Sequence, residues 1–240
     1  LEGIFEAVES GSADYGALPV ENSTAGSINQ AYDLLLDHDL RVWGEVIFRV
    51  RHTLLAVPGT RQSDVQKVRS HPQALAQCRG FLMRNKLEPH PFYDTAGAAK
   101  MVARESPKAS AAIASKLCAE LYDLDVIKEG IEDGSSNSTR FLLLSREPYQ
   151  GVGEKTSIIF AVPHEAGQLY DVLRLFAEAN VNLTRIASMP LRSDPGNYSF
   201  FLDFEGARQD DNIAELLGKV EKLAIGLKLL GSYPADVSSR

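Results

Sequence analysis

The sequence has few cysteines, no excess of basic residues and no long apolar run, and each absence excludes a class of protein. Two cysteines, Cys78 and Cys118, are too few for a disulfide framework, so we expect buried thiols in a reducing compartment. The apolar runs fall far short of the roughly 20 residues that span a bilayer. The formal charge of −7 comes without a basic tract, which disfavours phosphate-tracking contacts with nucleic acid. These absences predict a cytoplasmic protein that binds neither membranes nor nucleic acid.

Common cofactor and metal motifs are also lacking. The sequence contains no GxGxxG and no GxSxG, and residues 151–156 do not fit a phosphate loop because Glu154 separates the glycine from Lys155. The five histidines are scattered and lack the spacing of metal ligands. We therefore expect neither a cofactor nor a metal ion.

What the sequence does contain is a long alternation of helical and strand patterns over residues 1–147. Such an alternation is typical of an α/β domain with a mostly parallel sheet. Within it, alternating apolar residues predict one strand over 45–58, and alanine-rich segments predict helices over 95–104 and 109–121.

The pattern changes after residue 147. Residues 148–154 hold one proline and two glycines without periodicity, so we interpret them as a linker. Residues 155–240 then follow the order βαββαβ, which predicts a ferredoxin-like split arrangement.

Three polar segments lie at the ends of predicted elements. They are residues 21–26, residues 70–73 together with Gln77, and residues 135–141. One explanation is helix capping, because Asn, Ser and Thr accept hydrogen bonds from the first N–H groups of a helix. The other is binding of an anion, for which helix N-termini supply donors. The third segment precedes a strand and so favours binding. The residues alone therefore predict a site that holds a small polyanion by hydrogen bonds, either in an enzyme or in a solute-binding module.

Four motifs, in order, carry a family resemblance: PVENSTAGS at 19–27, SHPQALAQC at 70–78, DTAGAA at 94–99 and NSTRF at 137–141. Together they resemble prephenate dehydratase, and residues 155–233 resemble the ACT domain that follows the catalytic domain in that family. The resemblance implies a two-lobed, periplasmic-binding-protein-like catalytic domain over 1–147, with its active site in the cleft between the lobes. It also implies an ACT regulatory domain over 155–240. The family begins with a strand and a glycine-rich turn that this sequence does not contain, so we expect an active enzyme seen without its first strand.

The activity implied by the resemblance is that of a carbon–oxygen lyase in L-phenylalanine biosynthesis. The family converts prephenate to phenylpyruvate with loss of water and carbon dioxide. The resemblance implies that Thr139 acts on the departing hydroxyl, together with Asn22, Ser70 and Gln77 as catalytic residues. Because an alcohol is a poor general acid near neutral pH, we expect Thr139 to stabilise the leaving oxygen by a hydrogen bond rather than by full proton transfer.

Further side chains would bind the substrate. Ser23, Thr24 and Thr95 would add donors around its carboxylates. Arg140 has two open interpretations, neutralising a substrate carboxylate or pairing with a neighbouring acid of the protein. Phe141 completes the set, although it also opens an apolar strand, which is typical of a core residue.

In the ACT domain the resemblance implies binding of phenylalanine as a feedback inhibitor, in a homodimer or homotetramer. The implied residues are Gly167, Gln168, Leu169, Asn182, Leu183, Ser188 and Pro190. The sequence departs from the family at Gln168, where alanine is usual, and at Ala187 and Met189, where the family has Glu and Arg. Two readings therefore stay open, a regulatory site or an ACT fold kept for dimerisation with weakened sensing.

Two rival functions also stay open. Arogenate dehydratase belongs to the same family and acts on the transaminated substrate, and these residues do not distinguish a keto from an amino side chain. A non-catalytic amino-acid sensor would bind its ligand without turnover.

Overall fold

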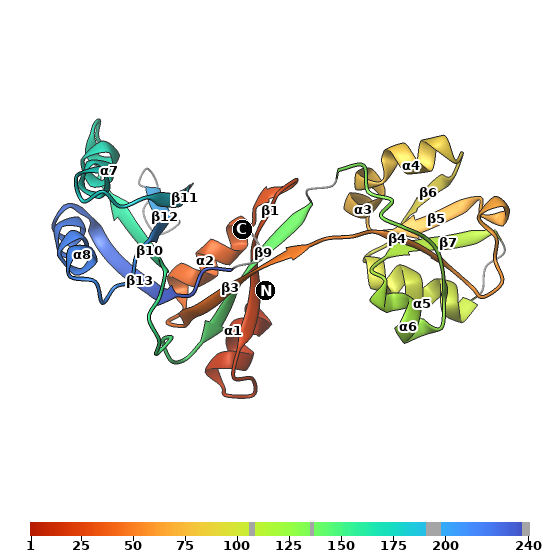
Figure 1. Cartoon of the computed structure of the whole chain (residues 1–240), viewed down its shortest axis with the longest axis horizontal. Helices are drawn as coiled ribbons and strands as arrows, with labels where there is room; N and C mark the ends of the chain where they lie inside the picture. The colour runs from red at the N-terminus through yellow and green to blue at the C-terminus, as the bar shows by residue number, and fades with distance from the viewer. Residues whose placement is uncertain (106–108, 135–136, 191–197, 237–240) are drawn as a thin grey trace. The chain divides into compact units, whose positions relative to one another are not determined.

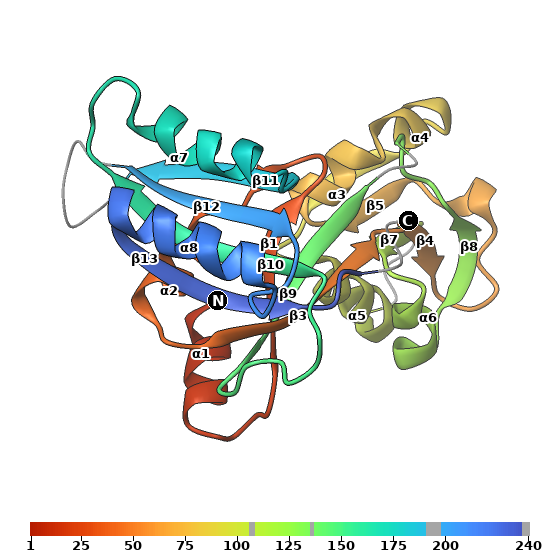
Figure 2. The same cartoon turned by 60° about the vertical axis from the view of Figure 1, so that its left-hand side comes forward.

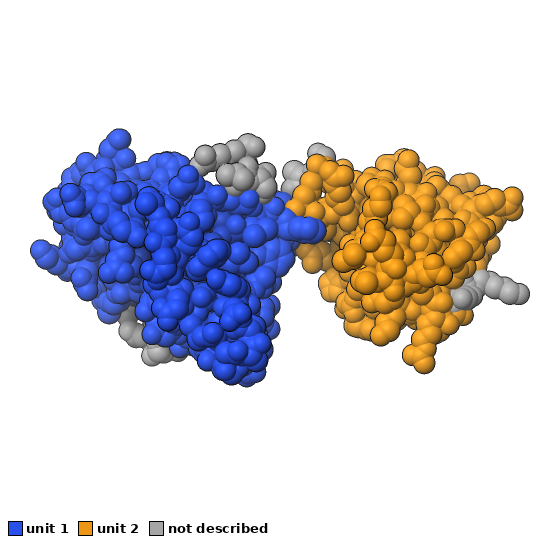
Figure 3. All heavy atoms as spheres, turned by 60° about the horizontal axis from the view of Figure 1, so that its bottom comes forward, with its two compact units in different colours: residues 1–48, 138–240 blue, residues 49–137 orange. Residues whose placement is uncertain are grey.

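A computed structural model describes residues 1–105, 109–134, 137–190 and 198–236. By its contacts the chain divides into two compact units (Figure 3). Unit 1 comprises Leu1–Phe48 and Ser138–Arg240, and unit 2 comprises Arg49–Asn137. Within the described ranges no helix is both long and apolar enough to cross a bilayer.

The first sheet of unit 1 has the strand order β2–β1–β9–β3, and Figure 1 labels its strands β1, β9 and β3. Its elements and the two helices beside it are α1 (Glu2–Glu9), β1 (Gly16–Asn22), β2 (Gly26–Ser27), α2 (Asn29–Asp37), β3 (Arg41–Arg49) and β9 (Ser138–Ser145). Strands β1 and β9 run antiparallel, with Asn22 opposite Thr139 and Glu21 opposite Arg140. This pairing brings two of the polar sequence segments together, although they are more than a hundred residues apart in the chain.

The second sheet of unit 1 is the C-terminal one, with the order β11–β12–β10–β13. Its elements are β10 (Lys155–Val162), α7 (Gln168–Glu178), β11 (Leu183–Pro190), β12 (Tyr198–Glu205), α8 (Asp211–Leu223) and β13 (Ile225–Tyr233). Neighbouring strands are antiparallel, and both helices lie on one side of the sheet (Figure 2). The predicted βαββαβ arrangement is confirmed.

The two faces of this second sheet belong to different cores. Phe160 and Leu202 pack with α7 and α8, while Ile159 and Phe201 pack with Tyr32 and other residues of the first sheet's layer. The approach is close at Gly231, where an added Cβ would collide with the carbonyl oxygen of Val42. Unit 1 is therefore a layered structure in which the C-terminal sheet packs directly on the sheet that carries Asn22 and Thr139.

Unit 2 is a five-stranded sheet, ordered β6–β5–β7–β4–β8, with helices around it. Its elements are β4 (Thr53–Ala56), η1 (Gln62–Asp64), β5 (Lys67–Ser70), α3 (Pro72–Gln77), α4 (Arg79–Arg84), β6 (Glu88–Pro91), α5 (Thr95–Glu105), β7 (Ser110–Ala114), α6 (Leu117–Tyr122) and β8 (Asp125–Glu129). Strand β5 is parallel to β6 and β7, whereas β4 is antiparallel to β7 and β8. The expectation of a mostly parallel sheet is confirmed for unit 2, where β5, β6, β7 and β8 run in one direction and β4 runs against them. It is wrong for the first sheet of unit 1, where β1 is antiparallel to β2 and β9.

Two expectations about individual elements are wrong. The alanine-rich segment 109–121 is not one helix but strand β7 followed by helix α6. All five residues of β7 are buried between β5 and β4, and burial in a sheet overrides alanine's helix preference. The segment 45–58 is not one strand either, because it contributes β3 to one sheet and β4 to another.

Candidate functional site

The Asn22 and Thr139 side chains form a hydrogen-bonded pair at the end of β1 and the start of β9. Asn22 Nδ2 donates to Thr139 Oγ1 over 3.0 Å and to the carbonyl oxygen of Ser138 over 3.2 Å. The amide oxygen of Asn22 accepts from the backbone N–H groups of Thr24 and Ala25 and from the Thr24 hydroxyl. These donors fix the orientation of the amide, so its NH₂ group must face Thr139.

This arrangement sets the role of the Thr139 hydroxyl. A hydroxyl has one proton and two acceptor lone pairs. Because Thr139 Oγ1 accepts from Asn22, its own proton is directed to another acceptor. Thr139 and Phe141 alternate along β9 with the buried Arg140 and Leu142, so Phe141 shares the half-buried face of Thr139 and does not lie in the core. The structure therefore places a hydroxyl donor and an aromatic ring on one face.

The capping explanation fails for residues 21–26, whereas in residues 70–73 it holds for His71 and not for Ser70. Helix α2 begins at Asn29 with Ile28 at its N-cap, so residues 21–26 form a turn that closes on Asn22 instead. Helix α3 is capped by His71, whose Nδ1 accepts from the N–H of Gln73, and not by Ser70. Ser23 joins the turn to β9, since its Oγ accepts from the N–H of Ser138. Residues 135–136 of the third segment lie outside the described residues.

A second polar cluster lies in unit 2 around Gln77, the last residue of α3. Gln77 Oε1 contacts His52 Nε2 at 2.7 Å and accepts from Asn137 Nδ2 over 3.1 Å. His52 and Asn137 are buried. Since the oxygen of Gln77 is engaged in this way, its NH₂ group faces away from His52. Sequence reasoning missed His52, because a lone histidine 25 residues before Gln77 carries no local signal.

Ser70 and Thr95 take different places in unit 2. Ser70 is fully buried, and its Oγ donates to the carbonyl oxygen of Ile113 over 2.6 Å, which joins β5 to β7. Sheet packing thus accounts for this serine, and its proton is not directed to a ligand. Thr95 is the first residue of α5, after Asp94, which accepts from the N–H of Gly97. Thr95 thus stands at a helix N-terminus, where an anion is favoured.

For Arg140 the structure supports the second of the two interpretations, in which the guanidinium pairs with acidic residues of the protein itself. Its guanidinium lies 2.6 Å from Glu45 Oε2 and 2.5 Å from Asp203 Oδ2, and it also donates to the hydroxyl of Tyr233. Burial lowers the pKa of Arg140, but Asp203 and Glu45 outweigh it and leave that pKa above its ordinary value. Burial raises the pKa of Glu45, but Arg140 and Lys155 bring it below its ordinary value. The guanidinium is thus neutralised inside unit 1.

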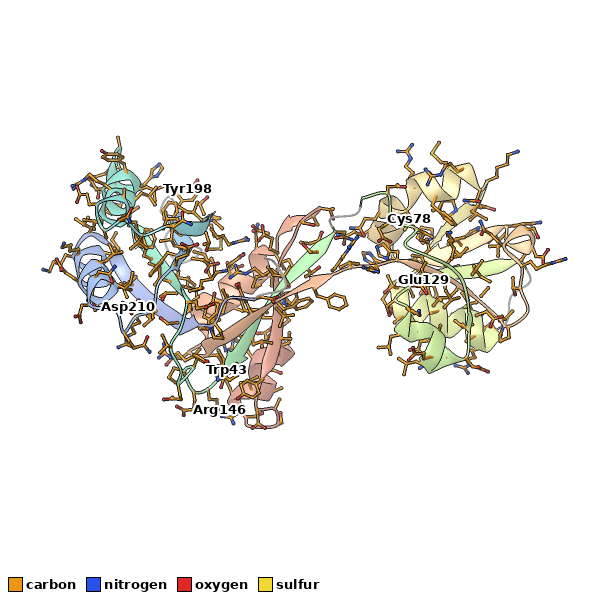
Figure 4. The ribbon with its side chains drawn as sticks, viewed as in Figure 1. Trp43, Cys78, Glu129, Arg146, Tyr198 and Asp210 are labelled. Atoms are coloured by element: carbon orange, nitrogen blue, oxygen red, sulfur yellow. The ribbon has the colours of Figure 1, made fainter. Side chains whose placement is uncertain are left out.

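The candidate residues of the C-terminal domain lie at two places. Gly167 adopts a left-handed conformation (φ 94°) at the N-cap of α7, so a side chain there would strain the backbone. Gln168 and Leu169 follow it, and Leu169 lines a cavity of about 100 Å³ together with His164 and Tyr198. Tyr198, labelled in Figure 4, is the first residue of β12. This turn therefore combines a glycine, a helix start and a small cavity.

The other candidates lie along and just before β11. Asn182 is exposed and precedes the strand, Leu183 is half-buried, and Ser188 and Pro190 are exposed on its outer face. Ala187 and Met189 point to the opposite face, into the core shared with the first sheet. Apolar residues at these two positions therefore match their surroundings.

Among the described residues, no three His, Cys, Asp or Glu side chains are grouped to hold a metal ion. The fold and the polar clusters define a class: a periplasmic-binding-protein-like α/β domain followed by an ACT domain. The prephenate dehydratase model matches residues 1–149, and the ACT domain model matches residues 156–222. The chain belongs to the prephenate dehydratase family.

Individual relatives agree with this assignment. An Arabidopsis thaliana protein named arogenate dehydratase/prephenate dehydratase 2 is 44% identical over 246 residues, covering 98% of this chain and 65% of its own length. A bifunctional chorismate mutase/prephenate dehydratase of Pseudomonas aeruginosa is 40% identical, covering 99% of this chain and 65% of its own. The chain thus spans less than two thirds of the length of these relatives.

Solved structures show the same fold. Prephenate dehydratase from Arthrobacter aurescens, in complex with L-Phe, has a TM-score of 0.88 and 30% identity, covering 100% of this chain and 80% of its own. GqqA, described as a novel type of quorum quenching acylase, has a TM-score of 0.90 and 36% identity, covering 98% of this chain and 87% of its own.

Proposed function

We propose that the chain catalyses the decarboxylating dehydration of prephenate to phenylpyruvate, with Thr139 as hydrogen-bond donor to the departing hydroxyl. In this reaction the bond to the ring carboxylate breaks and its electron pair enters the ring. The C–O bond then breaks, carbon dioxide is released, and hydroxide takes up a proton to become water. Because the product ring is aromatic, the protein needs only to position the substrate and stabilise the leaving oxygen.

The observation that carries this proposal is the Asn22–Thr139 hydrogen bond. An amide donor on Thr139 Oγ1 leaves the hydroxyl proton for an external acceptor, which is the geometry that a leaving hydroxyl requires. The amide also makes Thr139 a stronger donor, because hydrogen bonds in a chain polarise one another. No proton need be fully transferred from the alcohol, whose pKa is far from neutral.

Arogenate is the second candidate substrate. The observation that favours it is that several plant relatives, among them two from Petunia hybrida at 43% identity, are named arogenate dehydratases. Prephenate and arogenate differ in a keto or amino group remote from the ring hydroxyl, so Thr139 would act in the same way on both. Turnover of the two compounds, measured side by side under identical conditions, identifies the substrate by the ratio of kcat/KM.

Acyl hydrolysis, which is how GqqA is described, is less well supported by this geometry. It requires a nucleophile activated by a neighbouring base, whereas the group on Thr139 Oγ1 is an amide NH₂, which cannot accept a proton. An amide substrate included in the same assays provides the direct comparison.

The test of the proposed function is a Thr139 series. Thr139→Ala removes the donor and is expected to lower kcat by about 10²-fold or more. Thr139→Ser keeps the hydroxyl and should retain most of the activity, which controls for a change in packing. If Thr139→Ala turned over at the same rate as the wild type, Thr139 would have no role in the reaction. A folded chain that binds either compound without turnover would instead establish the non-catalytic sensor.

The proposal includes regulation by phenylalanine at the ACT domain. It is supported by the α7 turn with its cavity, by Ser188 and Pro190 on the outer face of β11, and by the L-Phe complex of the Arthrobacter relative. Calorimetry with added phenylalanine, together with activity measurements, tests it. Binding with a flat activity curve would favour an ACT domain kept for assembly. Sedimentation would test the expected homodimer or homotetramer, and the cytoplasmic location stays a prediction.

A further inference from the structure

Four charged side chains connect the two sheets of unit 1, and we call them the charge quartet: Glu21, Arg140, Arg185 and Asp203. In the first sheet Glu21 is opposite Arg140, and in the C-terminal sheet Arg185 is opposite Asp203. Each strand pair therefore presents one acid and one base. Across the sheets the charges are complementary, since Arg140 pairs with Asp203 at 2.5 Å and Arg185 forms an ion pair with Glu21.

Both halves of the quartet lie next to an irregularity in their strands. The register of β1 against β9 shifts between Pro19 and Glu21, and the register of β11 against β12 shifts between Leu183 and Arg185. A β-bulge redirects the side chains beside it and bends the strand. These two irregularities therefore aim Glu21 and Arg185 at each other.

The two connections differ in how firmly they are held. Arg140 and Asp203 are 9% and 1% exposed, and the Ser157 hydroxyl also donates to Asp203. The link of Arg185 to Glu21 is looser, with 10% and 40% of the side chains exposed. Arg185 Nη2 also donates to Ser27 over 2.9 Å, while its buried Nε has no hydrogen-bond partner among the described residues. A buried donor without a partner is costly and rare, so Arg185 is the member whose contacts can be rearranged with least loss.

The quartet is also adjacent to the proposed catalytic pair. Asn22 follows Glu21 in β1, and Thr139 precedes Arg140 in β9. Side chains alternate along a strand, so a displacement of Glu21 or Arg140 moves the backbone that carries its neighbour. The Asn22–Thr139 hydrogen bond spans the same two strands, and a small change in their register changes its geometry.

We propose that Arg185 and Asp203 are positioning residues for the reaction: through Glu21 and Arg140 they hold the Asn22–Thr139 pair in register. A ligand at β11 then changes turnover by shifting Arg185 within this strand. The inference rests on the proposed function, and it names the route by which the ACT domain acts on the same site. Leu183 and Ser188, two candidate ligand residues, lie on either side of Arg185 in β11, so the ligand and the quartet share one strand.

The experiment compares Arg185→Met, Glu21→Gln and the double variant with the wild-type chain. Arg174→Met is the matched control, because Arg174 lies in the same domain and pairs with Glu178 at 2.6 Å, but on the exposed surface of α7. We expect each quartet variant to lower kcat about tenfold or more, because misplaced reacting groups are costly, while KM stays within about twofold. The double variant should be no slower than the singles, since both changes break one link.

Two further readouts separate positioning from a purely structural role. Phenylalanine should still bind to Glu21→Gln, whose change lies outside the ACT domain, but should alter its turnover less than that of the wild type. Without any ligand, amide hydrogen exchange in β1 and β9 should be faster in Arg185→Met than in Arg174→Met. Loss of folded protein alone would lower the activity without altering the phenylalanine response.

The inference would be overturned if a folded Arg185→Met variant had the same kcat, the same phenylalanine response and the same amide exchange as the wild type. The proposed function would then remain intact. Absence of turnover in the wild type would instead overturn the proposed function. The exchange measurement would then still decide whether the ACT domain holds β1 and β9 through the quartet.

Discussion

Removing the buried guanidinium of Arg140 is the sharpest test of what stabilises unit 1. Arg140→Met keeps much of the side-chain volume but leaves Glu45 and Asp203, each 1% exposed, without their shared cation. Lys155 still contacts Glu45, and Ser157 still donates to Asp203. The variant therefore produces two buried carboxylates that are only partly compensated.

The expected loss follows from the cost of an uncompensated buried charge. Breaking a buried ion pair by removing one partner costs about 3–5 kcal/mol, and the remaining partners of Glu45 and Asp203 place the loss at about 3 kcal/mol. With a urea m-value of about 1–3 kcal/mol/M, the unfolding midpoint should fall by at least about 1 M. Arg140→Lys should lose less, because it keeps a charge but not the planar fork that reaches both acids.

The chain has a built-in reporter for this measurement. Its one tryptophan, Trp43, lies on β3 (Figure 4), the strand that also carries Glu45. The ring is between those of Tyr15 and Tyr149, at centroid distances of 5.1 and 5.3 Å. Separation of these rings on unfolding should change the fluorescence of Trp43, so urea titrations report on unit 1 directly.

Arg174→Met is the matched control for the burial argument. Arg174 and Glu178 also meet at 2.6 Å, but their side chains are 44% and 58% exposed. Exposed pairs contribute little, because water and salt screen them, so the midpoint should not move measurably. Equal midpoints for Arg140→Met and Arg174→Met would refute the reasoning, since the two pairs differ mainly in burial.

Two further predictions concern ionisation. Because Arg140 and Lys155 keep the pKa of Glu45 below its ordinary 4.5 despite burial, the unfolded chain takes up this proton first as the pH falls. The carboxylate therefore contributes stability above about pH 4.5 and loses it below. The difference in urea midpoint between wild type and Glu45→Gln should accordingly shrink as the pH falls below 4.5, and a constant difference would contradict this. Burial, with the charges of Glu132 and Asp133, raises the pKa of Cys78 to about 12. A thiol reagent near pH 8 should thus label Cys78 (Figure 4) only after unfolding, and rapid labelling of the native chain would show that the thiol is accessible.

Much of unit 1 could be predicted from sequence because its signals are local. In the C-terminal domain, helical and strand periodicities follow one another without ambiguity, and their order alone specifies the βαββαβ topology. The motifs that contain Asn22 and Thr139 are recognisable from their residues. The contact between them is not, because the pairing of two strands 117 residues apart in the chain produces no pattern in either segment.

The errors in unit 2 have a different physical origin. Four of residues 110–114 are serine or alanine, and so short an apolar run does not distinguish a buried strand from a helix. The difference is made by β5 and β4, which take up the backbone hydrogen bonds of β7 on both sides. Ser70 is a similar case, because its role depends on the carbonyl of Ile113, which lies 43 residues away. Tertiary partners decided both outcomes.

Arg140 shows how one short motif serves two faces of a strand. In β9 the side chains of Thr139 and Phe141 point to one face, and the guanidinium between them points to the other, where Asp203 and Glu45 neutralise it. An interaction with a substrate carboxylate would require Arg140 to leave both acids buried without their shared cation, at the cost already considered for Arg140→Met. Because side chains alternate along the strand, the motif has two separate roles. The Thr139 hydroxyl lies on the face proposed to bind the substrate, and the Arg140 charge connects β9 to the C-terminal sheet through Asp203. The charge in this motif is therefore evidence about the contact between the two sheets of unit 1 rather than about a substrate.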